Sequence, residues 1–115
     1  MPKLLHSNRT SFATIQIESG DICFISVAQT GVLVRSYKPG FVGSLVGSFI
    51  GPILYKEQNV YSAAATAMVL AEQFPQQETL AFNNPVLAAF ANAVWHLETP
   101  ARVAVGLHEA MKTQR

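Results

Sequence analysis

Two polar side chains stand on an otherwise apolar segment, VLAAFANAVWHL, and their spacing suits a ligand pocket. Asn92 and His96 are four residues apart, so on an α-helix they lie on the same face, with the aromatic residues Phe90 and Trp95 nearby. The alternative is structural: His96 would form a hydrogen bond at the C-terminal end of the helix, where a positive charge is favourable. The pattern favours this alternative. A small-molecule-binding protein or minor enzyme is therefore the second hypothesis for the chain.

The remaining residues capable of catalysis or metal binding form no recognised constellation. Cys23 lies alone in the apolar segment ICFISVA, which is typical of an inert buried thiol. One cysteine allows neither an internal disulfide nor a cysteine zinc site, and the three histidines lack the spacing of an HExxH motif. The GxSxG and GK[ST] signatures of hydrolases and phosphate loops are absent as well. We therefore expect a non-enzymatic protein with no catalytic residue, no metal and no cofactor.

The first half of the chain shows the alternation that is typical of β-strands. In FATIQIE, residues 12–18, three apolar side chains on one face alternate with polar ones on the other. Segment 22–28 is apolar on both faces, a glycine-containing turn separates it from a third strand over residues 32–37, and segment 53–57 can add a fourth strand. These segments predict an antiparallel β-meander of three or four strands. Residues 1–11 show no such pattern and are expected to form a loose lead-in.

The second half of the chain predicts three helices. Each is preceded by a capping Asn or Thr, and the second and third begin with proline at the first helical position. The expected helices span residues 60–74, 85–97 and 100–112. Strands followed by helices define the α+β class rather than a parallel βαβ sheet. We expect a single α+β domain over residues 1–115, with the β-meander and a glycine-rich connection in residues 12–57 and the helices in residues 58–115.

A repeat of glycines and bulky residues, FVGSLVGSFIGPIL, forms the connection between the two halves. Gly43, Gly47 and Gly51 are four residues apart, so in a helix they form a small-residue face opposite pairs of bulky side chains. Each glycine costs such a helix about 1 kcal/mol relative to alanine, and close packing against a second helix would offset this cost. In a strand the same period is also regular, because the three glycines then alternate with Phe41, Leu45, Phe49 and Ile53 along one face. We prefer a short helix over residues 41–50 to a strand.

The composition indicates that a partner covers part of the surface. Half of the residues are hydrophobic and 13% are charged, whereas a typical domain carries about 25% charged residues. The predicted helices 60–74 and 85–97 are apolar on nearly every side, which one small sheet cannot cover, unless their alanines simply tolerate solvent. We expect a protein that acts by association: a homo-oligomer, in the simplest case a dimer, or a complex with another protein. The expected contact residues are Gly43, Gly47, Gly51, Ala64 and Met68.

Charge and the N-terminal sequence argue against several other partners and locations. The net charge is +1 and the eight basic residues are scattered, so no basic patch indicates nucleic acid. The segment MPKLLHSNRT lacks the apolar run of a signal peptide, which favours the cytoplasm. Residues 39–55 are uncharged and flanked by Tyr-Lys pairs, as in a membrane-surface segment. Their glycines and prolines make membrane association the third and least favoured hypothesis.

Overall fold

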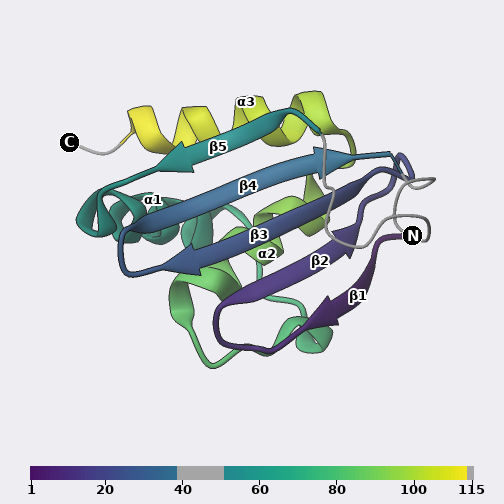
Figure 1. Ribbon diagram of the computed structural model, residues 1–115, viewed down its shortest axis with the longest axis horizontal. Coiled ribbons are helices and arrows are strands. Elements are labelled where there is room, and N and C mark those ends of the chain that lie inside the picture. Colours follow the sequence, from purple (N-terminus) through teal and green to yellow (C-terminus); the bar gives the residue numbers. More distant parts are fainter. Residues whose placement is uncertain (39–50, 114–115) are drawn as a thin grey trace.

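The computed structural model describes residues 1–38 and 51–113, which form a β-sheet with three helices on one face (Figure 1). The strands are β1 (Lys3–Ser7), β2 (Phe12–Gln16), β3 (Ile22–Ala28), β4 (Gly31–Tyr37) and β5 (Ile53–Glu57). The helices are α1 (Val60–Gln73), α2 (Pro85–His96) and α3 (Pro100–Lys112), with a short 3-10 helix, η2 (Glu78–Leu80), between α1 and α2. The predicted α+β class is confirmed, with five strands among the described residues instead of three or four.

The sheet is an antiparallel meander in which strands adjacent in sequence are adjacent in space, in the order β1-β2-β3-β4-β5. Ile25 of β3 is paired with Ala13 of β2 and with Val34 of β4, so the core-facing side chains align across the sheet. At the start of β4, Gly31 has a φ of 150°, and an added Cβ would lie 1.6 Å from the carbonyl oxygen of Glu57. Only glycine fits at this point of close contact between β4 and the end of β5.

β1 occupies the stretch that we expected to be a loose lead-in, so that prediction was wrong. The strand pairs with β2, but its register shifts between Leu4 and His6. This irregularity breaks the alternation of apolar and polar residues by which a strand is recognised in a sequence. The turn after β1 did carry a sequence signal. Asn8 Oδ1 accepts hydrogen bonds from the backbone N–H groups of the second, third and fourth residues that follow it.

The helices begin where the sequence predicted, and the predicted caps hold them. The side chain of Asn59 accepts hydrogen bonds from the first turn of α1, and Asn84 and Thr99 do the same for α2 and α3. Proline occupies the first turn of α2 and of α3, where its missing N–H group is no loss. Each helix also ends within one residue of its predicted end. Short-range signals therefore define the helical half of the chain.

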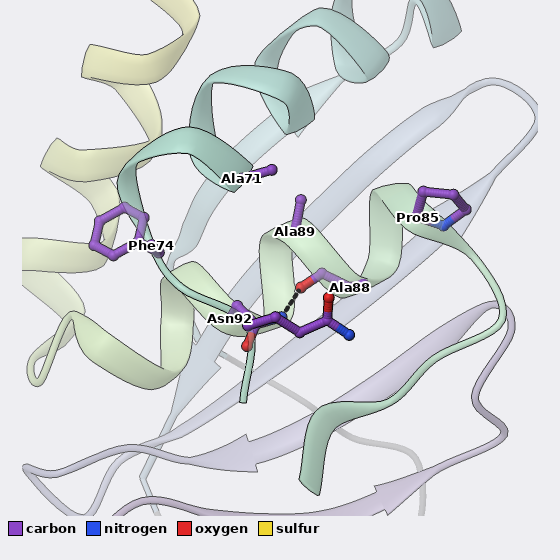
Figure 2. A pocket seen from close by; sticks show the side chains of 7 residues that line it. Ala71, Phe74, Pro85, Ala88, Ala89 and Asn92 are labelled. Carbon is purple, nitrogen blue, oxygen red and sulfur yellow. Dashed lines mark hydrogen bonds between the residues drawn. The ribbon is translucent and has the colours of Figure 1, made fainter. Parts of the chain in front are cut away.

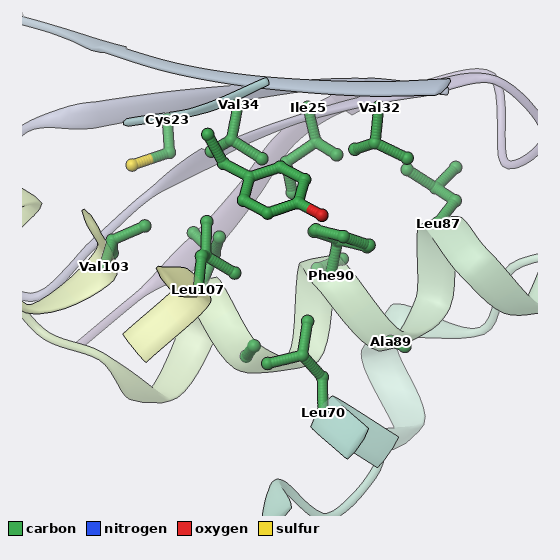
Figure 3. Packing of buried hydrophobic residues seen from close by; sticks show 14 of the residues in the cluster. Cys23, Ile25, Val32, Val34, Leu70, Leu87, Ala89, Phe90, Val103 and Leu107 are labelled. Atoms are coloured by element: carbon green, nitrogen blue, oxygen red, sulfur yellow. The ribbon is translucent and has the colours of Figure 1, made fainter. Parts of the chain in front are cut away.

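The three helices do not lie equally close to the sheet. α2 packs against β2 and β3, α3 lies along β5, and α1 packs against both other helices and reaches β4 and β5 (Figure 1). At the centre of the core, the ring of Tyr55 is 5.2 Å from that of Phe90, and its hydroxyl donates a hydrogen bond of 3.1 Å to Thr66 of α1. Figure 3 shows Leu70 of α1 on the side of Phe90 that faces away from the strands. α1 is thus the outer helix over this part of the core.

The glycine repeat falls mostly outside the described residues. The helix that we predicted for residues 41–50, which includes Gly43 and Gly47, falls in this part of the chain. Gly51 is described, and an added Cβ at this position would lie 1.6 Å from the backbone oxygen of Ser36. This glycine therefore packs against β4 of its own chain. In the two described ranges, no helix is both long enough and apolar enough to span a membrane.

Candidate functional site

The outer face of α1 is apolar and exposed. α1 buries the side that bears Thr66 and Leu70. On the opposite side Tyr61 is 84% exposed and Met68 is 69% exposed, more than any other large hydrophobic side chain of the three described helices. Small residues three or four positions from these two complete the surface, since residues at that spacing share one face of a helix. We call this surface the α1 stripe, and it consists of Tyr61, Ala64, Ala65, Met68 and Ala71.

The α1 stripe carries no charge until its C-terminal end, where the exposed Glu72 lies on the same face, four residues after Met68. The first charged residue of α1 is Glu72, which lies in the last turn of the helix. Charged side chains are depleted at the centre of protein–protein contacts, where aromatic residues and methionine are enriched. A contiguous exposed apolar surface on a small protein commonly marks such a contact. The α1 stripe therefore has the composition of the centre of an interface.

Contacts at the inner side and at the end of α1 fix the orientation of this surface. Thr66 Oγ1 accepts a hydrogen bond from the Tyr55 hydroxyl and donates one of 3.0 Å to the carbonyl oxygen of Ser62. Just beyond the C-terminal end of α1, the ring of Phe74 stacks on that of His96, with 6.0 Å between the ring centroids and an interplanar angle of 15°. The α1 stripe is thus held at a defined position on the fold.

A pocket lies beside the α1 stripe, between the C-terminal half of α1 and α2 (Figure 2). Its volume is about 210 Å³. The lining residues are Ala71, Phe74, Gln76, Pro85, Ala88, Ala89 and Asn92. Ala71 belongs both to the pocket and to the α1 stripe, so the two features form one continuous surface. The lining is largely apolar, which favours an apolar occupant.

Asn92 lines this pocket, but its polar atoms are engaged within the protein. Its Oδ1 accepts a hydrogen bond of 2.6 Å from the backbone N–H of Gln77, and its Nδ2 donates one of 2.7 Å to the carbonyl oxygen of Ala88. The residue is buried. Asn92 therefore joins the α1–α2 connection to α2, and its amide is already satisfied without a ligand.

The other three residues of the predicted ligand pocket do not line this cavity. Phe90 is fully buried in the core against Tyr55, and Trp95 is half-buried at the edge of the core. His96 Nε2 lies 3.3 Å from the carbonyl oxygen of Pro75, in the connection that follows α1. The structure therefore places Phe90, Trp95 and His96 in contacts that hold α2 to the rest of the chain.

Two of the predicted contact residues, Ala64 and Met68, lie on the α1 stripe, whereas Gly51 packs inside its own chain. The sequence analysis missed Tyr61, which is the most exposed aromatic residue of the described helices. A signal for it was present, because Tyr61 precedes Met68 by seven residues, or two helical turns. Residues at that spacing lie on one face, so a helix that exposes Met68 also exposes Tyr61.

The remaining chemically reactive groups offer no competing site. Cys23 is fully buried; burial, with a further contribution from the charge of Asp21, raises the pKa of its thiol from 9.0 to about 12. A thiol with so high a pKa is almost entirely protonated at neutral pH and is a poor nucleophile. In the parts of the chain that the structure describes, no three His, Cys, Asp or Glu side chains are grouped so as to hold a metal ion.

Comparison with known proteins identified no relative: no family model matches the chain, and no curated protein or solved structure is significantly similar to it. The distinguishing feature of the described surface is therefore an apolar helix face, uncharged before Glu72, that is continuous with a small apolar pocket.

Proposed function

We propose that the protein is non-enzymatic and acts by self-association, with two copies meeting through the α1 stripe. The observation that carries this proposal is the exposure of Tyr61 and Met68 on a helix face that carries no charge before Glu72. Fully burying one side chain of this size contributes about 1.5–3 kcal/mol. A symmetric contact buries each of them twice, once on each copy.

The small residues of the α1 stripe favour a second helix as the partner. Ala64 and Ala65 lie between Tyr61 and Met68, so the surface is low between these two large side chains. Another helix can approach closely over alanine, at an axis separation at the short end of about 8–10 Å. A second copy of α1 supplies such a helix, and the absence of charge before Glu72 removes like-charge repulsion at the centre of the contact.

A small-molecule ligand has less support. The pocket beside α1 measures about 210 Å³, whereas pockets for small molecules commonly measure about 300–1,000 Å³. The amide of Asn92, the buried polar group in its lining, is already bonded within the chain. The setting that we propose for the association is the cytoplasm, where the buried thiol of Cys23 remains reduced.

Sedimentation velocity at two protein concentrations tests self-association. We expect the mass to rise with concentration toward twice the 12.5 kDa of one chain. Met68→Glu should shift the equilibrium toward the monomer, because it places a charge at the centre of the contact. Val105→Glu is the matched control, since Val105 is 61% exposed but lies on α3. A monomeric wild type, or equal effects of the two variants, would falsify the proposal.

A further inference from the structure

The pocket beside α1 and the exposed ring of Tyr61 complement each other. We propose that each copy inserts Tyr61 into the α1–α2 pocket of the other copy, so that the two α1 helices run antiparallel about a two-fold axis. This inference rests on the self-association proposed above and specifies its geometry. It assigns the pocket a single kind of occupant, an aromatic side chain from a second copy.

The size and lining of the pocket suit such an occupant. A volume of about 210 Å³ is small for a metabolite, but a cavity of about 150 Å³ already admits a benzene ring. Phe74, Pro85 and Ala89 present apolar atoms to a ring. Gln76 is exposed and also lines the pocket, so its amide is available to a phenolic hydroxyl at the entrance. An aromatic body with one polar end matches this combination.

The spacing along α1 fits two equivalent insertions. Tyr61 and Ala71 are ten residues apart, which corresponds to about 15 Å along the helix axis. When two such helices are antiparallel, the Tyr61 end of one copy reaches the Ala71 end of the other, and the reverse contact forms at the same time. Between these ends, Met68 of each copy faces Ala64 of the other, so a large side chain meets a small one twice.

The charges of α1 favour the same orientation. α1 has no acidic residue in its first turn and no basic residue in its last turn, where Glu72 instead adds a negative charge. In contrast, α2 and α3 carry His96 and Lys112 in their last turns. A helix has a partial positive charge at its N-terminus and a partial negative charge at its C-terminus. At the N-terminal end of α1 the carboxylate of Glu57 already compensates this charge, because its Oε1 accepts a hydrogen bond of 3.1 Å from the backbone N–H of Asn59. The C-terminal end has no basic residue to compensate its negative charge.

An antiparallel second copy keeps the two Glu72 carboxylates apart, one at each end of the contact. Among the described residues, Glu72 has no ion-pair partner within the chain that this contact would have to break. A parallel pair would instead place Glu72 beside Glu72 and Tyr61 beside Tyr61, and it would leave both pockets without their occupant.

Mixed disulfide formation tests the arrangement. Tyr61→Cys and Ala88→Cys are prepared separately, mixed in equal amounts and oxidised mildly; the buried native thiol of Cys23 does not compete. Ala88 lies on α2 and lines the pocket, so a covalent dimer that contains one chain of each variant locates residue 61 at the pocket. We expect this mixed dimer, and little covalent dimer from either variant alone. A mixture of Tyr61→Cys with Ala101→Cys on exposed α3 is the control and should stay unlinked.

Filling the pocket provides an independent readout. Ala88→Leu should weaken the dimer by about tenfold or more without altering α1, and Tyr61→Ala should weaken it comparably. Because both remove the same contact, the double variant should lose no more than either single variant. Tyr61→Phe should keep most of the affinity, since the ring is the main contact.

The outcomes separate the two proposals. A wild-type chain that stays monomeric at every concentration overturns both of them. A dimer that Met68→Glu disrupts, but in which Tyr61→Cys links to itself rather than to Ala88→Cys, overturns the insertion and leaves self-association through α1 standing. Additive losses from Tyr61→Ala and Ala88→Leu also overturn the insertion, because independent sites give additive effects.

Discussion

α1 and α2 look alike in sequence and behave differently in the fold. Both follow a capping asparagine, and both are apolar on nearly every side. α2 buries seven of its twelve residues, whereas α1 buries four of its fourteen. The difference comes from position, because α2 packs against β2, β3 and α1, whereas α1 packs mainly against the two other helices and lies on the outer side of Phe90. An apolar composition thus permits burial on all sides but does not ensure it.

The polar residues of the two helices point the same way, into the protein. Thr66 of α1 bonds to Tyr55 in the core, and Asn92 of α2 bonds to the backbone of Gln77. Neither helix therefore marks its outer face with polar side chains before its last turn. On α1 the exposed face is instead made of Tyr61 and Met68, which is why it resembles an interface rather than ordinary surface.

The largest contrast should appear when one aromatic ring is removed from each helix. Phe90→Ala should lower the free energy of unfolding by about 3–5 kcal/mol, because it leaves a cavity between Tyr55 and Leu70. Tyr61→Ala should change it by no more than about 0.5 kcal/mol in dilute, monomeric protein. Urea denaturation followed by circular dichroism measures both. Similar losses for the two variants would mean that α1 is as buried as α2.

A smaller loss should follow when the hydrogen bonds of Asn92 are removed. Asn92→Ala should lower the free energy of unfolding by about 1–3 kcal/mol, since the backbone N–H of Gln77 loses its acceptor. Asn83→Ala is the matched control, because Asn83 is exposed and uses its backbone N–H rather than its side chain to contact Arg9. If both variants unfold at the same urea concentration as the wild type, the hydrogen bonds of Asn92 do not stabilise the fold. The result would then favour a role for its amide in ligand binding.

Much of this fold could be predicted because its signals are local. Capping residues and prolines identified the start of each helix, and alternation identified β2. β1 was missed because its register shift between Leu4 and His6 disrupts the alternation that was sought. A strand of five residues at the sheet edge is defined by its pairing with β2, which a single sequence does not display.

The candidate site could be predicted only in part. Periodicity places Ala64 and Met68 on one face of α1, but which face is outermost depends on how α2 and α3 pack against it. The predicted pocket residues on α2 were chosen for their chemistry, and tertiary contacts with Pro75 and Gln77 satisfy their polar atoms. The actual pocket combines small residues from two helices, and small residues carry no signal of their own.

The stability of the protein at alkaline pH should report on the burial of Cys23 between the sheet and the helices. The pKa of Cys23 is raised to about 12 in the folded chain, above its ordinary value of 9.0. As the pH rises past 9.0, the unfolded chain loses the thiol proton while the folded chain keeps it, so the folded state loses stability. This loss should approach about 1.4 kcal/mol per pH unit for a single group, until the folded thiol also ionises.

Comparison with Cys23→Ala isolates the contribution of this thiol. The burial of Tyr37 and Tyr55 also raises the pKa of each phenol, so both proteins lose stability at high pH. The wild type should lose it more steeply between about pH 8 and about pH 10.5, a range that spans the ordinary thiol pKa of 9.0. Parallel curves for the two proteins would show that water reaches Cys23 and that the sheet is not sealed by α2 and α3.

The smallest change in the free energy of unfolding should come from a substitution on the outer face of α1 in the monomer. This substitution gives the most direct test of the difference between the two helices. Met68→Gln replaces a side chain that is 69% exposed with a polar one of similar length, so the free energy of unfolding should change by less than about 0.5 kcal/mol in dilute protein.

At high concentration the wild type should gain stability by mass action through its dimer, and Met68→Gln should gain less. Leu70→Ala, on the buried side of the same helix, should lose about 2–5 kcal/mol at both concentrations. A loss of more than about 1 kcal/mol for Met68→Gln in dilute protein would show that the outer face already packs within one chain. Self-association would then have no free surface on α1 to use.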